Sequence, residues 1–245
     1  MRLLVSVRDA EEARAALAGG ADIIDAKEPA LGPLAPVSRA MLQSICASVP
    51  VTVALSVALG DAQPLALEAV VASVAPLRRR VALYFKVAVI SAAPDEAGDG
   101  IAAACRMLEG RADRPRLVVA RYVDQPSDAT DLSRWIAVSA AAGARGLLVD
   151  TSRKDGPGLF GSVGAPSLAA LREQASRHGI WLAVAGGVTI TNLAQLAVVG
   201  PDVLGVRGAV CQGTRTDTLS AALVLQLRDA LARVSRSREA PALPV

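Results

Sequence analysis

The sequence predicts an α/β fold, a single (β/α)8 barrel, and three observations support this prediction. Short apolar or β-branched runs alternate eight times with longer alanine-rich segments that carry charges at helical spacing. The alternation fills about 235 of the 245 residues, close to the roughly 250 of a typical barrel of this class. Hydrophobic residues make up 52% of the chain, enough for one large core and too many for a disordered protein.

The eight short runs are mostly apolar on both faces, as expected of parallel strands that are covered on both sides. They span residues 3–7, 22–26, 51–57, 81–87, 116–122, 146–150, 181–185 and 203–206. Helices are expected between them, over residues 9–18, 36–48, 64–77, 94–110, 128–142, 166–178, 190–199 and 216–234.

Residue types typical of helix ends mark several of these boundaries. Side-chain oxygens suited to N-terminal caps are those of Asp9, Ser38, Ser167 and Thr189. Glycines suited to C-terminal stops are Gly19, Gly110, Gly143 and Gly179. No compositional break marks a second domain, so we expect one catalytic domain over residues 1–235 and a flexible tail over residues 236–245.

The rival architecture is a doubly wound open sheet, which usually carries a G-x-G-x-x-G turn after its first strand. Here that turn reads Val7-Arg8-Asp9-Ala10. The sequence therefore favours the closed TIM barrel.

Composition also excludes several classes of function. The net charge of +3 is only mildly basic, the longest basic run is Arg78-Arg79-Arg80, and aromatic residues are scarce, so no nucleic-acid partner is expected. No long apolar stretch or signal-peptide core indicates a membrane partner or export. Three distant cysteines and a single histidine indicate neither a disulfide framework nor a metal site. We expect a cytoplasmic protein that needs no metal or other cofactor.

The three lysines are the strongest functional signal. Of the 26 lysines and arginines, only Lys27, Lys86 and Lys154 are lysines. Each falls at or just beyond the end of a predicted strand, and barrel enzymes place their chemistry at the C-terminal ends of the strands. Arginine serves equally well as a solvated surface charge, but only lysine can lose its proton and act as a Schiff-base nucleophile or a general base. We therefore interpret these lysines as active-site residues rather than ordinary loop charges.

Carboxylates end the same strands. Asp25 lies two residues before Lys27, which places both side chains on one face of an extended strand. Asp25 is expected either to be a charge partner of Lys27 or to move protons during imine formation and hydrolysis. Asp150 directly follows an apolar run and is a stronger candidate for an active-site carboxylate than Asp61, which we place beyond the third strand. Tyr84 alternates with Lys86 and shares its face.

A phosphate site is predicted from the loops after the seventh and eighth strands, where barrel enzymes commonly bind phosphate. Gly186 and Gly187 follow the seventh strand, and Arg207 and Gly208 follow the eighth. Glycines allow the backbone to approach the anion closely, and Arg207 is expected to add a bidentate contact. The alternative is that these glycines only form tight turns.

Four segments together resemble the (5-formylfuran-3-yl)methyl phosphate synthase family. They are Ala21-Asp22-Ile23-Ile24-Asp25-Ala26-Lys27-Glu28-Pro29, Tyr84-Phe85-Lys86-Val87, Leu148-Val149-Asp150-Thr151-Ser152-Arg153-Lys154-Asp155-Gly156 and Gly205-Val206-Arg207-Gly208-Ala209. The resemblance runs from the first strand to about residue 213. The loop that begins at Ala26-Lys27-Glu28-Pro29 departs from the Val-Lys-Asn-Pro start and more polar loop of archaeal members.

The resemblance implies a TIM-barrel lyase that joins two molecules of glyceraldehyde 3-phosphate with loss of phosphate and water. It implies a role in making methanofuran, or a related carrier in bacteria that oxidise one-carbon compounds. By resemblance, Lys27 is the Schiff-base lysine, Lys86 the proton acceptor, and Asp25, Asp150 and Lys154 further polar site residues.

Two other interpretations remain open from the residues: another Schiff-base aldolase for a sugar or triose phosphate, and a non-catalytic barrel that binds a phosphorylated metabolite. The expected partner is a small triose phosphate, and we expect a homo-oligomer.

Overall fold

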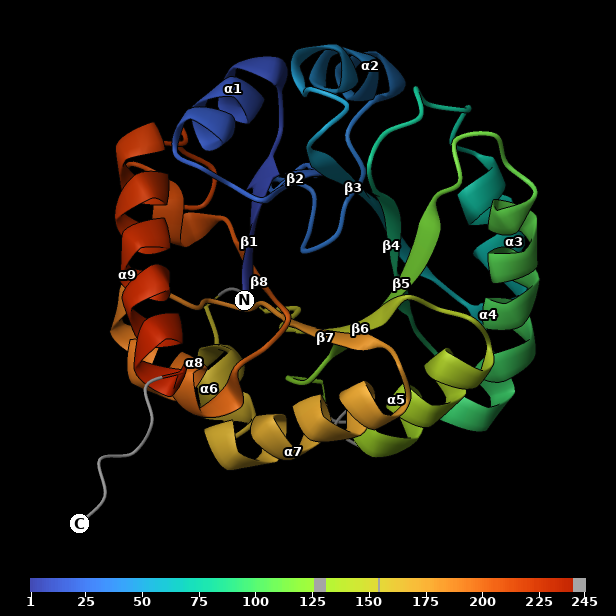
Figure 1. The fold of residues 1–245 in the computed structure, drawn as a ribbon. Coiled ribbons are helices and arrows are strands. Elements are labelled where there is room, and N and C mark those ends of the chain that lie inside the picture. Colours follow the sequence, from blue (N-terminus) through green and yellow to red (C-terminus); the bar gives the residue numbers. More distant parts are fainter. Residues whose placement is uncertain (126–130, 154, 240–245) are drawn as a thin grey trace.

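The predicted barrel is confirmed by the computed structural model, which describes residues 1–125, 131–153 and 155–239, the last five as backbone only. Parallel strands pair in chain order, and β8 pairs with β1 to close the barrel (Figure 1). The strands are β1 (Arg2–Val7), β2 (Ile23–Ala26), β3 (Ala54–Ala62), β4 (Leu83–Val89), β5 (Arg116–Tyr122), β6 (Gly146–Asp150), β7 (Trp181–Val184) and β8 (Val203–Val206).

Helices surround the barrel on the outside (Figure 1). The α-helices are α1 (Ala10–Ala18), α2 (Arg39–Ser48), α3 (Leu67–Ala72), α4 (Pro94–Glu109), α5 (Leu132–Ala141), α6 (Gly158–Ser162), α7 (Ala165–Arg177), α8 (Leu193–Val199) and α9 (Ala221–Glu239). Short 3-10 turns η1 (Pro64–Ala66), η2 (Ile190–Asn192) and η3 (Gly208–Val210) lie in three of the loops. Asp9, Ser38 and Thr189 accept backbone hydrogen bonds as N-caps, as predicted.

Two hydrophobic clusters follow from the alternation of side chains along the strands. The larger cluster fills the layer between the strands and the helices. The smaller one fills the lower barrel interior and includes Leu4, Ile23, Tyr84, Leu148 and Trp181. The rings of Tyr84 and Trp181 meet edge to face, with centroids 5.5 Å apart. This interior cluster forms the floor below the strand ends.

The third strand differs most from its predicted range. The backbone carbonyl of Pro50 accepts a hydrogen bond from the N–H of Val53, and this turn delays β3 until Ala54. The strand then continues to Ala62, so Asp61 lies within it rather than beyond it. The prediction also ended the fourth strand two residues early, because β4 runs on to Val89.

Several predicted helix boundaries are wrong for identifiable reasons. Helix α3 ends at Ala72, well before Pro76, whose ring cannot continue a helix. Ser167 is not an N-cap, because α7 begins at Ala165 behind Gly164 and accommodates a proline in its first turn. The short helix α6 was not predicted.

The last helix begins later and extends further than its predicted range. Leu219 forms a β-bridge with Cys211, which holds the preceding segment in a loop, and α9 starts at Ala221. The helix then continues to Glu239, past the boundary expected at residue 235. Residues 240–245 of the expected tail lie outside the described residues.

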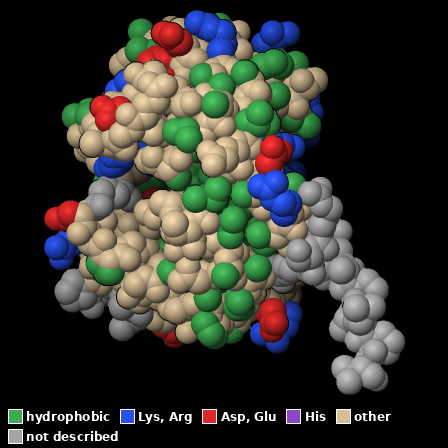
Figure 2. Space-filling model, turned by 90° about the vertical axis from the view of Figure 1, so that its left-hand side faces the viewer, with side chains coloured by type: hydrophobic (Ala, Val, Ile, Leu, Met, Phe, Trp, Pro, Cys, Tyr) green, Lys and Arg blue, Asp and Glu red, His purple; other side chains and the backbone are tan. Residues whose placement is uncertain are grey.

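The outer face that carries α9 shows hydrophobic side chains along its middle and charged ones mainly at its edges (Figure 2). The exposed large apolar side chains of α8 and α9 are Val198 and Leu225. Scattered apolar side chains of this kind are normal on protein surfaces, and they define no site by themselves. None of the helices in the described part of the chain has the length and apolar character of a membrane span.

Candidate active site

One cavity of about 540 Å³ opens at the C-terminal ends of the strands and reaches down to Tyr84 and Trp181. The predicted site residues that line it are Lys27, Lys86, Asp150, Gly186, Gly187, Arg207 and Gly208. Asp25 is fully buried beside it. Lys154 lies outside the described residues, so its predicted place in the site stays a prediction. The structure therefore gathers into one place residues that are up to 181 positions apart in the sequence.

Asp25 and Lys86 form a buried ion pair across the barrel interior. The Nζ of Lys86 lies 2.8 Å from Oδ2 of Asp25, and the hydroxyl of Ser6 donates to the same oxygen at 2.8 Å. Asp25 is 0% and Lys86 4% exposed. Strand register explains the cluster, because Ser6 and Ser56 are the direct neighbours of Asp25 on β1 and β3.

The surroundings of Asp25 favour its ionised form. Burial alone raises the pKa of this carboxyl. The positive charges of Lys86 and Lys27, with the nearby Ser56 hydroxyl, outweigh burial and hold the pKa below its ordinary value. Asp25 is therefore a carboxylate at neutral pH and keeps a fixed negative charge beneath the cavity.

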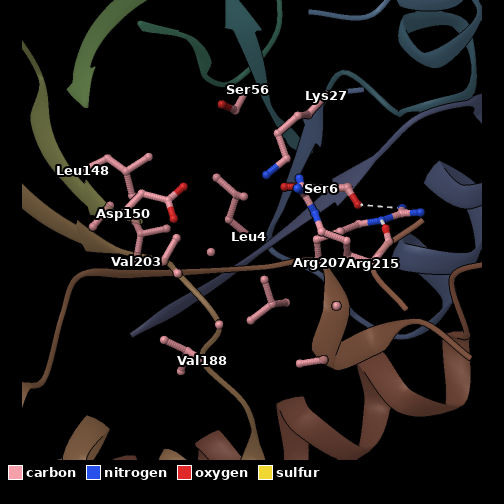
Figure 3. A pocket seen from close by; sticks show the side chains of 18 of the residues that line it. Leu4, Ser6, Lys27, Ser56, Leu148, Asp150, Val188, Val203, Arg207 and Arg215 are labelled. Atoms are coloured by element: carbon pink, nitrogen blue, oxygen red, sulfur yellow. Dashed lines mark hydrogen bonds between the residues drawn. The ribbon is translucent and has the colours of Figure 1, made fainter. Parts of the chain in front are cut away.

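Lys27 directly follows β2 and lines the cavity, with its side chain only 7% exposed (Figure 3). Its backbone N–H donates to the carbonyl of Val7 at 2.9 Å, which ties the residue to the end of β1. The spacing of Asp25 and Lys27 predicted that Asp25 is a charge partner of Lys27 or moves protons. The charge of Lys27 does lower the pKa of Asp25, and the structure adds a salt bridge of Asp25 to Lys86 that the spacing did not predict.

Asp150 ends β6 and lies across the cavity from Lys27 (Figure 3). Its side chain is almost fully buried, and its Oδ1 accepts the backbone N–H of Thr151 at 2.7 Å. The carboxylate thus has a fixed orientation at the rim. Tyr84 lines the cavity on the same strand as Lys86, as the alternation predicted.

The two glycine loops lie together at the cavity. Gly186 and Gly187 both have positive φ values, of 106° and 70°. A Cβ on Gly186 would lie 2.8 Å from Oγ1 of Thr151, so the turn excludes larger residues. Gly208, in the loop after β8, lines the same cavity. This arrangement places backbone from both loops where a phosphate is predicted.

The guanidinium of Arg207, for which a phosphate contact is predicted, is already bound by groups of the protein. Two of its nitrogens bind the carboxylate of Glu12, one of them at 2.9 Å from Oε1. The remaining N–H groups donate to the backbone carbonyls of Ser6, Arg215 and Asp217. A guanidinium has five N–H donors, and all five are engaged. Arg207 therefore holds the loop after β8 in place, and in this structure none of its N–H groups is left for the predicted contact with phosphate.

Glu12 is a structural partner that the sequence interpretation missed. Its backbone N–H donates to the N-cap residue Asp9 at 2.8 Å, and its side chain accepts the N–H of Arg8, the residue before the cap, at 2.9 Å. Asp9-Ala10-Glu11-Glu12 carries the signal for this local motif. Nothing local indicates the ion pair with Arg207, which is 195 residues away.

We expect Glu12→Ala to lower the free energy of unfolding by about 3–5 kcal/mol, because it leaves a buried guanidinium without its counter-charge. Glu12 is 4% and Arg207 6% exposed, so solvent cannot replace the lost partner. Urea denaturation measures the effect. The matched control is Glu11→Ala, one residue earlier on the exposed side of α1, with an expected change within about 0.5 kcal/mol. Equal midpoints for the two variants would contradict the structural role of the pair.

Two further polar residues, Asp61 and Arg215, lie near the strand ends. Asp61 does not line the cavity; it accepts a hydrogen bond from the hydroxyl of Tyr122 at 2.7 Å. Arg215 does line the cavity, and the sequence interpretation missed it. In the described part of the chain, no cluster of three or more His, Cys, Asp or Glu side chains could hold a metal ion.

Comparison with known proteins assigns the family. A family model described as 4-HFC-P synthase matches residues 3–228. The chain is 33% identical over 231 residues to a Methylorubrum extorquens protein and 31% identical over 237 residues to the (5-formylfuran-3-yl)methyl phosphate synthase of Archaeoglobus fulgidus. These matches cover 94% of this chain in both cases, and 91% and 99% of the respective relatives.

A solved structure, the 3-hexulose-6-phosphate synthase of Salmonella typhimurium, superposes with a TM-score of 0.59. The match covers 96% of this chain and 100% of that chain at 18% sequence identity, and it supports the barrel fold alone. The family match and the relatives at more than 30% identity decide the assignment. The chain belongs to the 4-HFC-P synthase family.

Proposed function

We propose that the protein condenses two molecules of glyceraldehyde 3-phosphate into (5-formylfuran-3-yl)methyl phosphate through a Schiff base on Lys27. The observation that carries this proposal is the placement of Lys27 in one cavity with the buried Lys86–Asp25 pair. A nucleophilic amine and a second lysine in the same enclosed space are what imine-based carbon–carbon bond formation needs. The product serves the biosynthesis of methanofuran or of a related carrier in one-carbon metabolism.

The first step is attack of the neutral Lys27 amine on the aldehyde carbon of one triose phosphate. Lys86, which forms an ion pair with Asp25, donates a proton to the hydroxyl of the carbinolamine, which leaves as water. The iminium forms on Lys27, and Lys86 becomes neutral. The same loss of a proton prepares Lys86 to act as a base in the next step.

Lys86 then takes the proton from the carbon next to the iminium and returns to its ammonium form. The electron pair of the broken C–H bond gives an enamine, which attacks the aldehyde carbon of the second molecule. The iminium re-forms on Lys27, and the aldehyde oxygen becomes a hydroxyl by taking a proton from Lys86. Asp25 stabilises the ammonium at the start and end of this cycle, because its carboxylate accepts from Nζ in the resting site. Ring closure and loss of one phosphate and two waters balance the atoms of the furan product, and hydrolysis frees Lys27.

The cavity supports the later steps as well. Its lower part is lined by apolar side chains such as Leu4, Val118 and Leu148, which can surround the carbon skeleton as it becomes an aromatic ring. The loops at Gly186 and Gly208 lie at the rim, where a phosphate group of a bound triose would be close to solvent. Asp150 faces the cavity opposite Lys27 and is placed to orient hydroxyl groups of the substrate.

Incubation with glyceraldehyde 3-phosphate as the sole substrate is expected to yield the furan product and free phosphate in equal molar amounts. The physical reason is that formation of each furan ring eliminates one phosphate group. Absorbance and a phosphate assay, followed in parallel, measure the two products. Unphosphorylated glyceraldehyde serves as the control substrate and should give no furan absorbance, because it carries no phosphate leaving group.

Two results would contradict this function. A reversible aldol product without phosphate release would indicate another Schiff-base aldolase. Tight binding of triose phosphate with neither product nor a borohydride-trapped adduct would indicate a barrel that only binds phosphorylated metabolites.

A further inference from the structure

The loop after β8 forms a narrow turn whose tip carries Arg215. Cys211 and Leu219 bridge its two sides, and the backbone N–H of Gln212 donates to the carbonyl of Thr218 at 3.0 Å. The carboxylate of Asp217 accepts the N–H of Thr214 at 2.6 Å. Hydrogen bonds within the loop therefore hold its tip in place.

Arg207 anchors this loop to the barrel. Its Nε donates to the carbonyl of Arg215 at 2.8 Å, and its NH2 group donates to the carbonyl of Asp217 at 3.0 Å. Glu12 holds the guanidinium of Arg207 from the other side. Arg207 thus fixes the backbone at the residue whose side chain enters the cavity.

The side chain of Arg215 is placed differently from that of Arg207. It lines the cavity on the same side as Lys27, with Asp150 opposite (Figure 3). Among the described residues its guanidinium makes one hydrogen bond, from NH2 to the carbonyl of Gly32 at 3.2 Å. The other N–H groups are available to a ligand, whereas those of Arg207 are all engaged within the protein.

Arg215 is also close to the predicted phosphate loop. A Cβ on Gly208 would lie 3.7 Å from the Cβ of Arg215. Partial burial lowers the pKa of Arg215 and the charge of Arg207 lowers it further, while Asp150 opposes this. A phosphate dianion bound here would balance the positive charge and accept charge-assisted hydrogen bonds.

We propose that Arg215 is the arginine that binds the substrate phosphate at the β8 loop, and that Arg207 is the positioning residue that holds it there. The ligand is a phosphate monoester. This inference rests on the proposed function for the identity of the substrate, but the anion site itself can be tested without turnover. Arg215 contributes to phosphate binding and takes no part in imine formation on Lys27.

Titration with inorganic phosphate, followed by calorimetry, tests the site directly. We expect Arg215→Gln to weaken phosphate binding roughly ten- to a hundred-fold, the range for loss of a charge-assisted contact. Arg215→Lys should recover part of the affinity, because lysine keeps the charge but not the bidentate fork. The matched control is Arg177→Gln, on the exposed end of α7 and outside the cavity, which should bind phosphate like the unaltered protein.

Steady-state kinetics and borohydride trapping separate phosphate binding from a purely structural role. With glyceraldehyde 3-phosphate, Arg215→Gln should raise KM more than it lowers kcat. With unphosphorylated glyceraldehyde, the rate of adduct formation should be unchanged. The thermal unfolding midpoint should also stay unchanged, since the side chain makes one hydrogen bond within the described structure.

Three results would overturn the proposal: phosphate binding that is unchanged in Arg215→Gln, no phosphate binding by the unaltered protein, or equal loss of adduct with both aldehydes. The last would mean that Arg215 only ties the loop to Gly32. Failure of the furan synthesis assay, with the phosphate titration as expected, would overturn the proposed reaction and leave the anion site standing.

Discussion

Lys27→Arg is expected to eliminate the covalent adduct with triose phosphate and to reduce turnover by roughly 10⁴-fold or more. Arginine preserves the positive charge beside Asp25, so the electrostatic surroundings change little. Its guanidinium stays protonated and cannot form an imine with an aldehyde. Borohydride reduction in the presence of glyceraldehyde 3-phosphate, followed by peptide mass mapping, measures the adduct on the unaltered protein and on the variant.

The adduct should map to the peptide that contains Lys27. Arg177→Gln again provides the control, since it changes an exposed charge far from the cavity and should trap adduct normally. An adduct that persists in Lys27→Arg, on any other lysine, would refute the role of Lys27 as nucleophile.

Lys86→Arg should still form the adduct on Lys27, more slowly because solvent must replace Lys86 as the proton donor, and should lose turnover by roughly 10²- to 10⁴-fold, the usual contribution of general acid–base catalysis. The arginine can still pair with the buried carboxylate of Asp25. It cannot give up its proton, so it cannot take one from the substrate carbon. Turnover is measured by furan absorbance, and exchange of the substrate C–H proton with deuterated solvent reports the base step directly.

The exchange measurement distinguishes a base from a structural charge. If Lys86 is the base, Lys86→Arg should form adduct without incorporating deuterium. The larger side chain enters a buried position, so circular dichroism is needed to show that the variant keeps its fold. Normal turnover in this variant would exclude Lys86 as the base.

The barrel could be predicted because each of its units carries local signals. Apolar runs of strand length recur eight times and glycines end several of the helices between them, while the absence of a G-x-G-x-x-G turn after the first strand disfavours the open sheet. The third strand was misplaced because the turn from Pro50 to Val53 lies inside an apolar run. Hydrophobicity does not distinguish that turn from the strand that follows it.

The site could be predicted only in part. The scarcity of lysine identified Lys27 and Lys86, because the sequence uses arginine at nearly all other basic positions. The salt bridge of Asp25 to Lys86 was not predicted, because spacing along one strand says nothing about which residue of β4 reaches across the barrel. The different roles of Arg207 and Arg215 depend on Glu12, which belongs to the other end of the chain.

The contact between Glu12 and Arg207 also constrains how the chain reaches its native state. It joins residues 195 positions apart, and the pairing of β1 with β8 closes the barrel over a similar separation. Contacts between such distant residues carry a large loop-closure entropy and slow folding. During synthesis, α1 emerges long before the strand that completes its ion pair. Glu12 must therefore stay solvated until β8 arrives, and the rim of the cavity takes its final shape only when the barrel closes.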